Sequence, residues 1–104
     1  MTAKPKTYQQ FQSAYPEVYS AYERLGEKIA ESGPLDQKTR ELIKLGMAAG
    51  RQAESSVHSH VHRALEAGAT PAEIEHAVLL GITTLGFPAT MAALSWTKEA
   101  LSGR

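Results

Sequence analysis

Apolar side chains recur along this chain at intervals of three and four residues, which is the period of an amphipathic α-helix. The clearest series consists of Tyr15, Val18, Tyr22, Leu25 and Ile29. No stretch alternates strictly between apolar and polar residues, as a half-buried strand would. The pattern therefore predicts an all-α protein.

Local signals for helix starts and ends divide the chain into five main helices. The first begins near Pro16, because proline suits a first helical turn, and it ends at Gly33. Asp36 is the predicted N-cap of the second helix, QKTRELIKLGMAAG. The third helix is predicted over residues 53–67, and Gly68 is the glycine that follows its C-terminus.

The strongest boundary signal in the chain starts the fourth helix. Thr70 is a predicted N-cap, Pro71 occupies the first helical position, and Glu73 closes a capping box. This helix is predicted to end near Gly86, and Pro88 begins the fifth helix. The short loops between the helices indicate mostly antiparallel neighbours.

The remaining N-terminal segment and the length of the chain complete the predicted organisation. Residues 1–6 are expected to form a disordered tail, residues 8–14 a short turn or helix, and residues 7–104 a single domain. A chain of 104 residues buries only roughly two-thirds of its unfolded surface on folding. Much of its apolar content is alanine, which buries little area, so we expect the domain to oligomerise.

Charge and composition exclude several classes of function. Eleven basic and eleven acidic residues cancel, and no cluster of positive charge is present for nucleic acid. The polar N-terminus does not resemble a signal peptide, and no stretch approaches the ~20 apolar residues of a membrane span. The chain has no cysteine, which excludes disulfides, thiolate metal sites and dithiol catalysis. We therefore expect a cytoplasmic protein without nucleic-acid or membrane partners.

The predicted third helix concentrates three of the four histidines within five positions. Its apolar stripe consists of Val57, Val61, Ala64 and Leu65. Glu54 falls inside this stripe, His58 and His60 lie on its opposite edges, and His62 points toward solvent. We expect Glu54 to be partly buried. Burying a carboxylate without a partner is costly, so Glu54 should be paired, have a raised pKa or face a cavity, and His58 one turn on is its obvious local partner.

The three alternate histidines do not by themselves predict a metal site. Helical residues two positions apart point roughly 160° away from one another, so only His58 and His62 could chelate one ion together. A third ligand would have to come from elsewhere in the chain. We therefore predict no metal and no cofactor.

Two longer segments resemble the carboxymuconolactone decarboxylase and AhpD-like family. The first is HVHRALEAGATPAEIEHAVLLGITTLGFPA, which starts at His60, and the second is LDQKTRELIKLGMAAGRQ over residues 35–52. The resemblance implies an AhpD-like helical domain that assembles as a homo-trimer or homo-hexamer. It also implies a site that combines a Cys-x-x-Cys-x-x-x-His segment with a glutamate on the preceding helix.

The family pattern falls on this chain with both sulfurs missing. Counting back from Gly68, the family histidine is His60, the glutamate is Glu41, and the two cysteine positions are Ala53 and Ser56. A serine hydroxyl has neither the accessible pKa nor the reversible redox chemistry of a thiol. The dithiol peroxidase route is therefore excluded, whereas the decarboxylase branch, which also lacks the dithiol, is the closer functional analogue.

Two hypotheses about function follow from this resemblance. The first is a lyase or isomerase acting on a small molecule, such as a carboxylate, with His60 and Glu41 as acid–base residues and Glu54 and His58 as further catalytic candidates. Its predicted substrate-binding residues are Ser56, Arg40 and Arg63. The alternative is a non-catalytic ligand-binding or scaffold oligomer that kept the fold.

Overall fold

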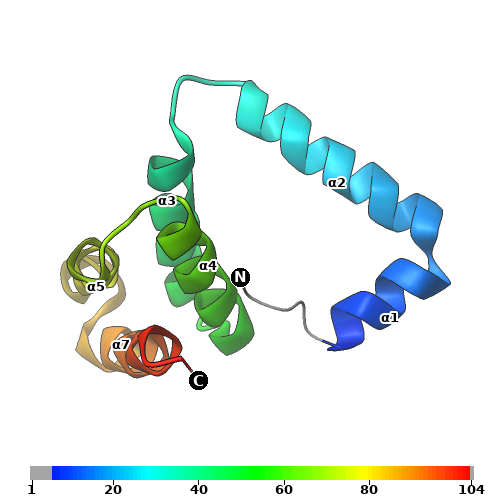
Figure 1. Cartoon of the computed structure of the whole chain (residues 1–104). Helices are drawn as coiled ribbons and strands as arrows, with labels where there is room; N and C mark the ends of the chain where they lie inside the picture. The colour runs from blue at the N-terminus through cyan, green and yellow to red at the C-terminus, as the bar shows by residue number, and fades with distance from the viewer. Residues whose placement is uncertain (1–5, 104) are drawn as a thin grey trace. The chain divides into compact units, whose positions relative to one another are not determined.

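The computed structural model describes residues 6–103, and in this part of the chain every regular element is a helix, without strands. Its helices are α1 (Lys6–Ala14), α2 (Pro16–Glu31), α3 (Gln37–Gly50), α4 (Glu54–Glu66), α5 (Pro71–Leu79), α6 (Ile82–Leu85) and α7 (Phe87–Leu101) (Figure 1). The prediction of an all-α fold is confirmed. The predicted tail at residues 1–6 lies outside the described residues except for Lys6, which begins α1.

The chain divides into two compact units, the first ending at Leu35 and the second beginning at Asp36. In the first unit α1 packs on α2 through aromatic rings. The ring centroids of Tyr8 and Phe11 lie 6.0 and 6.4 Å from that of Tyr19, which is buried. The apolar stripe of α2 predicted from the sequence, Tyr15, Val18, Tyr22, Leu25 and Ile29, is exposed in this structure.

The second unit contains the hydrophobic core, in which α4 packs on α3 and on α7, and α5 packs on α3 and α7. Its largest fully buried apolar side chains are Leu45, Ile74, Val57, Val61 and Val78. Thr90 and Thr97 of α7 are also fully buried, and their hydroxyls donate to the carbonyls of Gly86 and Ala93 one turn back. These bonds satisfy the buried hydroxyls without a partner on another helix.

The helix boundaries depend on the caps expected from the sequence. The Asp36 carboxylate accepts the backbone N–H of Thr39 at 2.8 Å, which caps α3. Thr70 and Glu73 form a complete capping box at α5, in which each side chain accepts the backbone N–H of the other residue. Gly68 follows α4 with a φ of +96°, the left-handed conformation that glycine adopts without a Cβ penalty.

The predicted fourth helix is interrupted after Leu79, which is a correction to the sequence-based boundary. The backbone N–H of Gly81 bonds to the carbonyl of Val78, three residues back, and α6 then continues for a single turn. At Gly81 α7 approaches closely, since an added Cβ would lie 2.9 Å from the Thr90 hydroxyl. This close contact with another helix is a tertiary feature that local sequence does not encode.

The connection between α3 and α4 is held by the side chain of Gln52. Its Nε2 donates to the carbonyls of Ala49 and Ala89, at 2.8 and 3.0 Å. Its backbone has a φ of 56°, the only positive value at a non-glycine residue in the described chain. Gln52 thereby links the start of α4 to the first turn of α7, which fixes the helix that carries the histidines. None of the described helices is long and apolar enough to cross a membrane.

Candidate active site

Glu41 on α3 and His60 on α4 form a direct contact between the two helices. The Oε1 atom of Glu41 lies 2.9 Å from the Nδ1 atom of His60. The side chains are 12% and 18% exposed, respectively, so the pair is largely shielded from water but not sealed. A hydrogen bond in such surroundings is stronger than one at an open surface.

The surroundings of Glu41 favour its ionised form. Burial alone raises the pKa of Glu41, but the hydrogen bond and positive charge of His60, with the charges of Lys44 and Arg63, outweigh burial and lower the pKa below its ordinary value of 4.5. Glu41 is therefore a carboxylate at neutral pH and can only accept hydrogen bonds. It follows that Nδ1 of His60 carries the proton in this contact.

This tautomer determines which nitrogen of His60 is available for chemistry. With Nδ1 donating to Glu41, the Nε2 atom of a neutral ring is left as a proton acceptor. The arrangement can therefore accept a proton at one ring nitrogen while the other holds the ring in place.

The predicted substrate-binding residues lie on the same two helices. Arg40 precedes Glu41 on α3 and is half-buried, and Arg63 on α4 is exposed and lies close enough to affect the charge of Glu41. Ser56 is half-buried one turn before His60 on α4. Lys44 was not singled out from the sequence, although its position three residues after Glu41 on a helix placed it on the same face.

The other two predicted catalytic residues form a separate cluster with α7. The Nε2 atom of His58 lies 3.4 Å from Oε1 of Glu99. Glu54, His58 and Glu99 each offer one ligand atom that lies within 4.8 Å of the other two. The expectation that Glu54 is partly buried is wrong, because its side chain is exposed in the first turn of α4. His58, which was expected to pair with Glu54, lies nearest to Glu99 instead. Glu99 was not found from the sequence because it is on α7, far from His58 along the chain.

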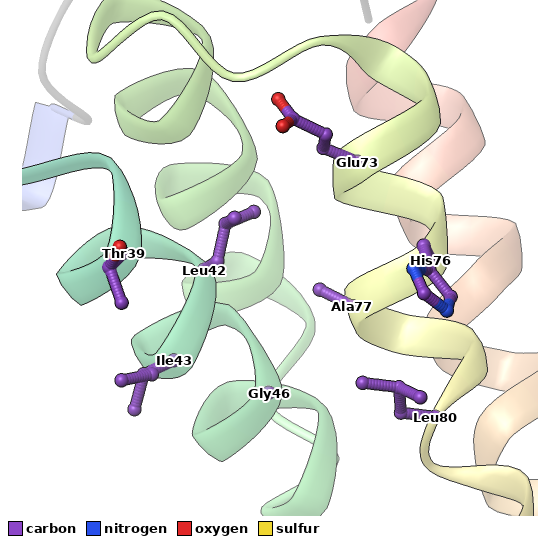
Figure 2. Close-up of a pocket in the computed structure, with 8 residues that line it drawn as sticks. All are labelled: Thr39, Leu42, Ile43, Gly46, Glu73, His76, Ala77 and Leu80. Atoms are coloured by element: carbon purple, nitrogen blue, oxygen red, sulfur yellow. The ribbon is translucent and has the colours of Figure 1, made fainter.

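A groove of about 490 Å³ lies between α3 and α5. It is lined by Thr39, Leu42, Ile43, Gly46, Glu73, His76, Ala77 and Leu80 (Figure 2). None of the site residues predicted from the sequence lines this groove. Figure 2 shows the side chains of Ala77, on α5, and Leu80, directly after α5, pointing toward α3. Apolar side chains therefore dominate the surface between the two helices.

Glu73, one of the polar residues that line the groove, has a structural role. The Glu73 carboxylate accepts the backbone N–H of Thr70 and the ammonium of Lys38, which is 3.0 Å away. These two interactions, in that order of importance, lower the pKa of Glu73. Glu73 therefore holds α5 to α3 as a bound carboxylate, and it is not available as a base for a molecule in the groove.

Comparison with known proteins finds a matching family and two similar uncharacterized proteins. Residues 16–99 match the carboxymuconolactone decarboxylase family. An uncharacterized protein of Methanocaldococcus jannaschii is 31% identical over 81 residues, which cover 77% of this chain and 78% of that protein. An uncharacterized protein of Haemophilus influenzae is 39% identical over 59 residues, but these cover 57% of this chain and only 52% of that protein, about half its length.

Solved structures share the fold over nearly the whole chain. A carboxymuconolactone decarboxylase family protein from Legionella pneumophila superposes with a TM-score of 0.76 at 24% identity, covering 90% of this chain and 87% of that one. A protein from Burkholderia xenovorans, proposed to be a carboxymuconolactone decarboxylase, gives a TM-score of 0.72 at 25% identity, covering 98% of this chain and 86% of that one. The chain belongs to the carboxymuconolactone decarboxylase family, as a member without cysteine.

Proposed function

We propose that this protein is a small-molecule enzyme of the carboxymuconolactone decarboxylase type, a lyase or isomerase that uses His60 and Glu41 for acid–base chemistry. The observation that carries the proposal is the 2.9 Å contact between Glu41 and His60, both largely buried. A proton-transfer site requires a group that gives and takes protons near neutral pH, and histidine is the side chain suited to this role.

His60 is the proposed proton-transfer residue and Glu41 its positioning partner. In a decarboxylation the carbon that loses carbon dioxide must gain a proton, and in an isomerisation a proton moves from one carbon to another. The Nε2 atom of His60 can supply or remove this proton, while the carboxylate of Glu41 keeps the ring in one tautomer. A dithiol is not required for either reaction, and the chain contains none.

The cations near Glu41 suit an anionic substrate. Arg63 and Lys44 both lower the pKa of Glu41 through their charge, so both lie within electrostatic reach of the pair. A substrate carboxylate could bind to Arg63, whose side chain is exposed, with Arg40 and Ser56 as further candidate contacts. We therefore propose a carboxylated small molecule, of which carboxylated lactones are the first class to test.

The test is a turnover assay on a panel of carboxylated lactones and related acids, chosen first by their ability to raise the melting temperature. His60→Gln should abolish turnover of any substrate found, and Glu41→Gln should reduce it by about 10²–10⁴-fold, the usual contribution of general acid–base catalysis. His62→Gln, which changes a histidine half a turn away on the same helix, is the matched control and should retain turnover. Turnover that survives in His60→Gln would contradict the proposal.

A second candidate function is a non-catalytic ligand-binding or scaffold oligomer, and the distribution of apolar side chains favours the oligomer. Monomeric soluble proteins rarely expose large contiguous apolar patches. In the first unit the α2 stripe is exposed, and in the second unit Ile43, Met47, Leu80 and Phe87 are between 42% and 64% exposed. We propose that these surfaces are covered by other copies of the chain in a homo-trimer or homo-hexamer.

The mass of the protein in solution tests this second proposal independently of any activity. Light scattering during size-exclusion chromatography should give a multiple of the 11.3 kDa chain mass. Replacing Val18 and Leu25 of α2 by lysine should shift the mass toward the monomer, whereas lysine at the exposed polar positions Glu17 and Glu23 should not. A stable monomer of the unmodified chain at micromolar concentration would exclude the oligomer.

A further inference from the structure

We propose that Glu54, His58 and Glu99 bind a divalent first-row transition-metal ion at the contact between α4 and α7, with Zn²⁺ as the representative ion. One ligand atom from each residue lies within 4.8 Å of the other two. Two of the residues come from α4 and one from α7, so a bound ion would join the two helices. This site is distinct from the Glu41–His60 pair and does not depend on the proposed acid–base function.

The first observation behind this proposal is the unsatisfied Nε2 atom of His58. Its Nε2 atom is buried and has no hydrogen-bond partner among the described residues, although Oε1 of Glu99 lies only 3.4 Å away. The two atoms are close but are not aligned for a hydrogen bond. A buried polar atom without a partner costs free energy, and an ion between the two residues would remove this cost.

The spacing of these atoms suits a tetrahedral ion. Zinc lies about 2.0–2.1 Å from imidazole nitrogen and about 2.0–2.2 Å from carboxylate oxygen, so tetrahedral ligand atoms are roughly 3.3–3.5 Å apart. The 3.4 Å between His58 and Glu99 falls within this range. Glu54 can complete the set by rotating its side chain, which is exposed and lies one turn before His58 on the same helix face.

The chemistry of the three ligands selects the class of ion. Two carboxylates balance the charge of a divalent cation, and an imidazole favours zinc and its neighbours over magnesium and calcium, which prefer oxygen ligands. The cation next to Glu99, Lys98, is 3.4 Å from Glu75 and is thus directed to another carboxylate. Three protein ligands leave a tetrahedral position open for water or another ligand.

The structure supplies the ligand that could not be foreseen from the sequence. Among the three histidines of the predicted helix, only His58 and His62 shared a face, and a third ligand was lacking. In the structure His62 is not part of the cluster, whereas Glu99 of α7 is. The proposal therefore replaces the expectation of no metal, and His62 becomes a matched control.

The test measures Zn²⁺ binding to the full chain, purified without a histidine tag, by isothermal titration calorimetry. We expect one saturable site per chain. Loss of an outer-shell partner alone weakens metal binding by about 10–100-fold, so His58→Gln, Glu54→Gln and Glu99→Gln should each weaken it at least tenfold. His62→Gln and Glu66→Gln, which change residues of α4 outside the cluster, should bind as the unmodified chain does.

A second measurement identifies the ligand atom directly. Zn²⁺ should change the ¹⁵N resonance of His58 Nε2, and Co²⁺ should give the visible absorption of a four- or five-coordinate ion in the unmodified chain and in His62→Gln only. The proposal is overturned if no saturable site is found, if any of the three cluster variants binds zinc as tightly as the unmodified chain, or if His62→Gln loses the site. If His58→Gln fails to fold, Glu99→Gln still decides, because it alters a side chain that is 47% exposed.

Discussion

His58 and His60 lie two positions apart on α4 and contact acidic residues on different helices. The Nε2 atom of His58 is 3.4 Å from Glu99 of α7, whereas Nδ1 of His60 is 2.9 Å from Glu41 of α3. Residues two apart on a helix point in nearly opposite directions, and α4 packs on α3 and on α7. One helix therefore supplies a histidine to each of two separate clusters.

Glu41→Gln should remove a pH-dependent part of the stability. The pKa of Glu41 in the folded protein is below its ordinary value of 4.5, since the interactions with His60, Lys44 and Arg63 outweigh burial. This contribution is fully present above the unfolded pKa and is lost as the pH falls through the lower, folded pKa. Urea unfolding between neutral and acid pH should therefore show that the free energy of unfolding falls more below about pH 4.5 in the unmodified chain than in Glu41→Gln.

The control for this experiment is Glu66→Gln, which removes an exposed carboxylate from α4. It separates the loss of the Glu41–His60 contact from the mere loss of one carboxylate, and the larger change in acid stability is expected for Glu41→Gln. An identical acid-induced loss in the unmodified chain and in Glu41→Gln would show that the Glu41–His60 contact does not favour the ionised carboxylate.

Two glycine-to-alanine substitutions should have opposite effects on stability. At Gly46, inside α3, an added Cβ meets no atom within 4 Å, so Gly46→Ala should raise the free energy of unfolding by about 0.5–1 kcal/mol. At Gly81 the Cβ would lie 2.9 Å from the Thr90 hydroxyl and 3.1 Å from the Val78 carbonyl. Gly81→Ala should therefore lower stability by roughly 1–3 kcal/mol, because one of these neighbours is backbone.

Urea denaturation of both variants measures this difference. A neutral or stabilising Gly81→Ala would indicate that α7 stands further from this turn than the structure has it. A destabilising Gly46→Ala would indicate that another molecule, such as a second copy of the chain, packs against this side of α3.

Thr70→Ala should destabilise the protein by about 1 kcal/mol, because the hydroxyl that accepts the backbone N–H of Glu73 is lost from the N-cap of α5. Thr70→Ser keeps the accepting oxygen and should retain most of the stability. Chemical denaturation of the two variants separates the cap from other effects at this position. Equal losses in both would assign the effect to the methyl group of Thr70 and not to the cap.

Ile74→Ala should cost roughly 2–5 kcal/mol, since Ile74 is fully buried in the core of the second unit and the substitution leaves a cavity. Leu79→Ala on the same helix is the control, because Leu79 is 47% exposed and its loss should cost far less. Thermal unfolding, monitored by circular dichroism, gives the loss of stability in each of the two variants. Similar losses would mean that Leu79 is buried in the native assembly.

Features encoded in neighbouring residues were predicted from the sequence. The caps at Asp36 and Thr70 were predicted correctly because each depends on a side chain and a backbone N–H three residues apart. The glycine that follows α4, Gly68, was found for the same reason. The family followed from the order and spacing of such local features, and the match over residues 16–99 confirms it.

Features that join distant segments were decided by the tertiary structure. Glu99 reaches His58 only because α7 packs on α4, and the break after Leu79 accompanies the close approach of α7 to Gly81. The burial of Glu54 was wrongly expected, since periodicity assigns a residue to a helix face but does not tell where along the helix that face is covered. Sequence by itself therefore determined the all-helical fold, the caps at Asp36 and Thr70 and the family. Packing between helices determined where the predicted fourth helix breaks and which charged side chains meet, because those contacts depend on how the whole core fills space.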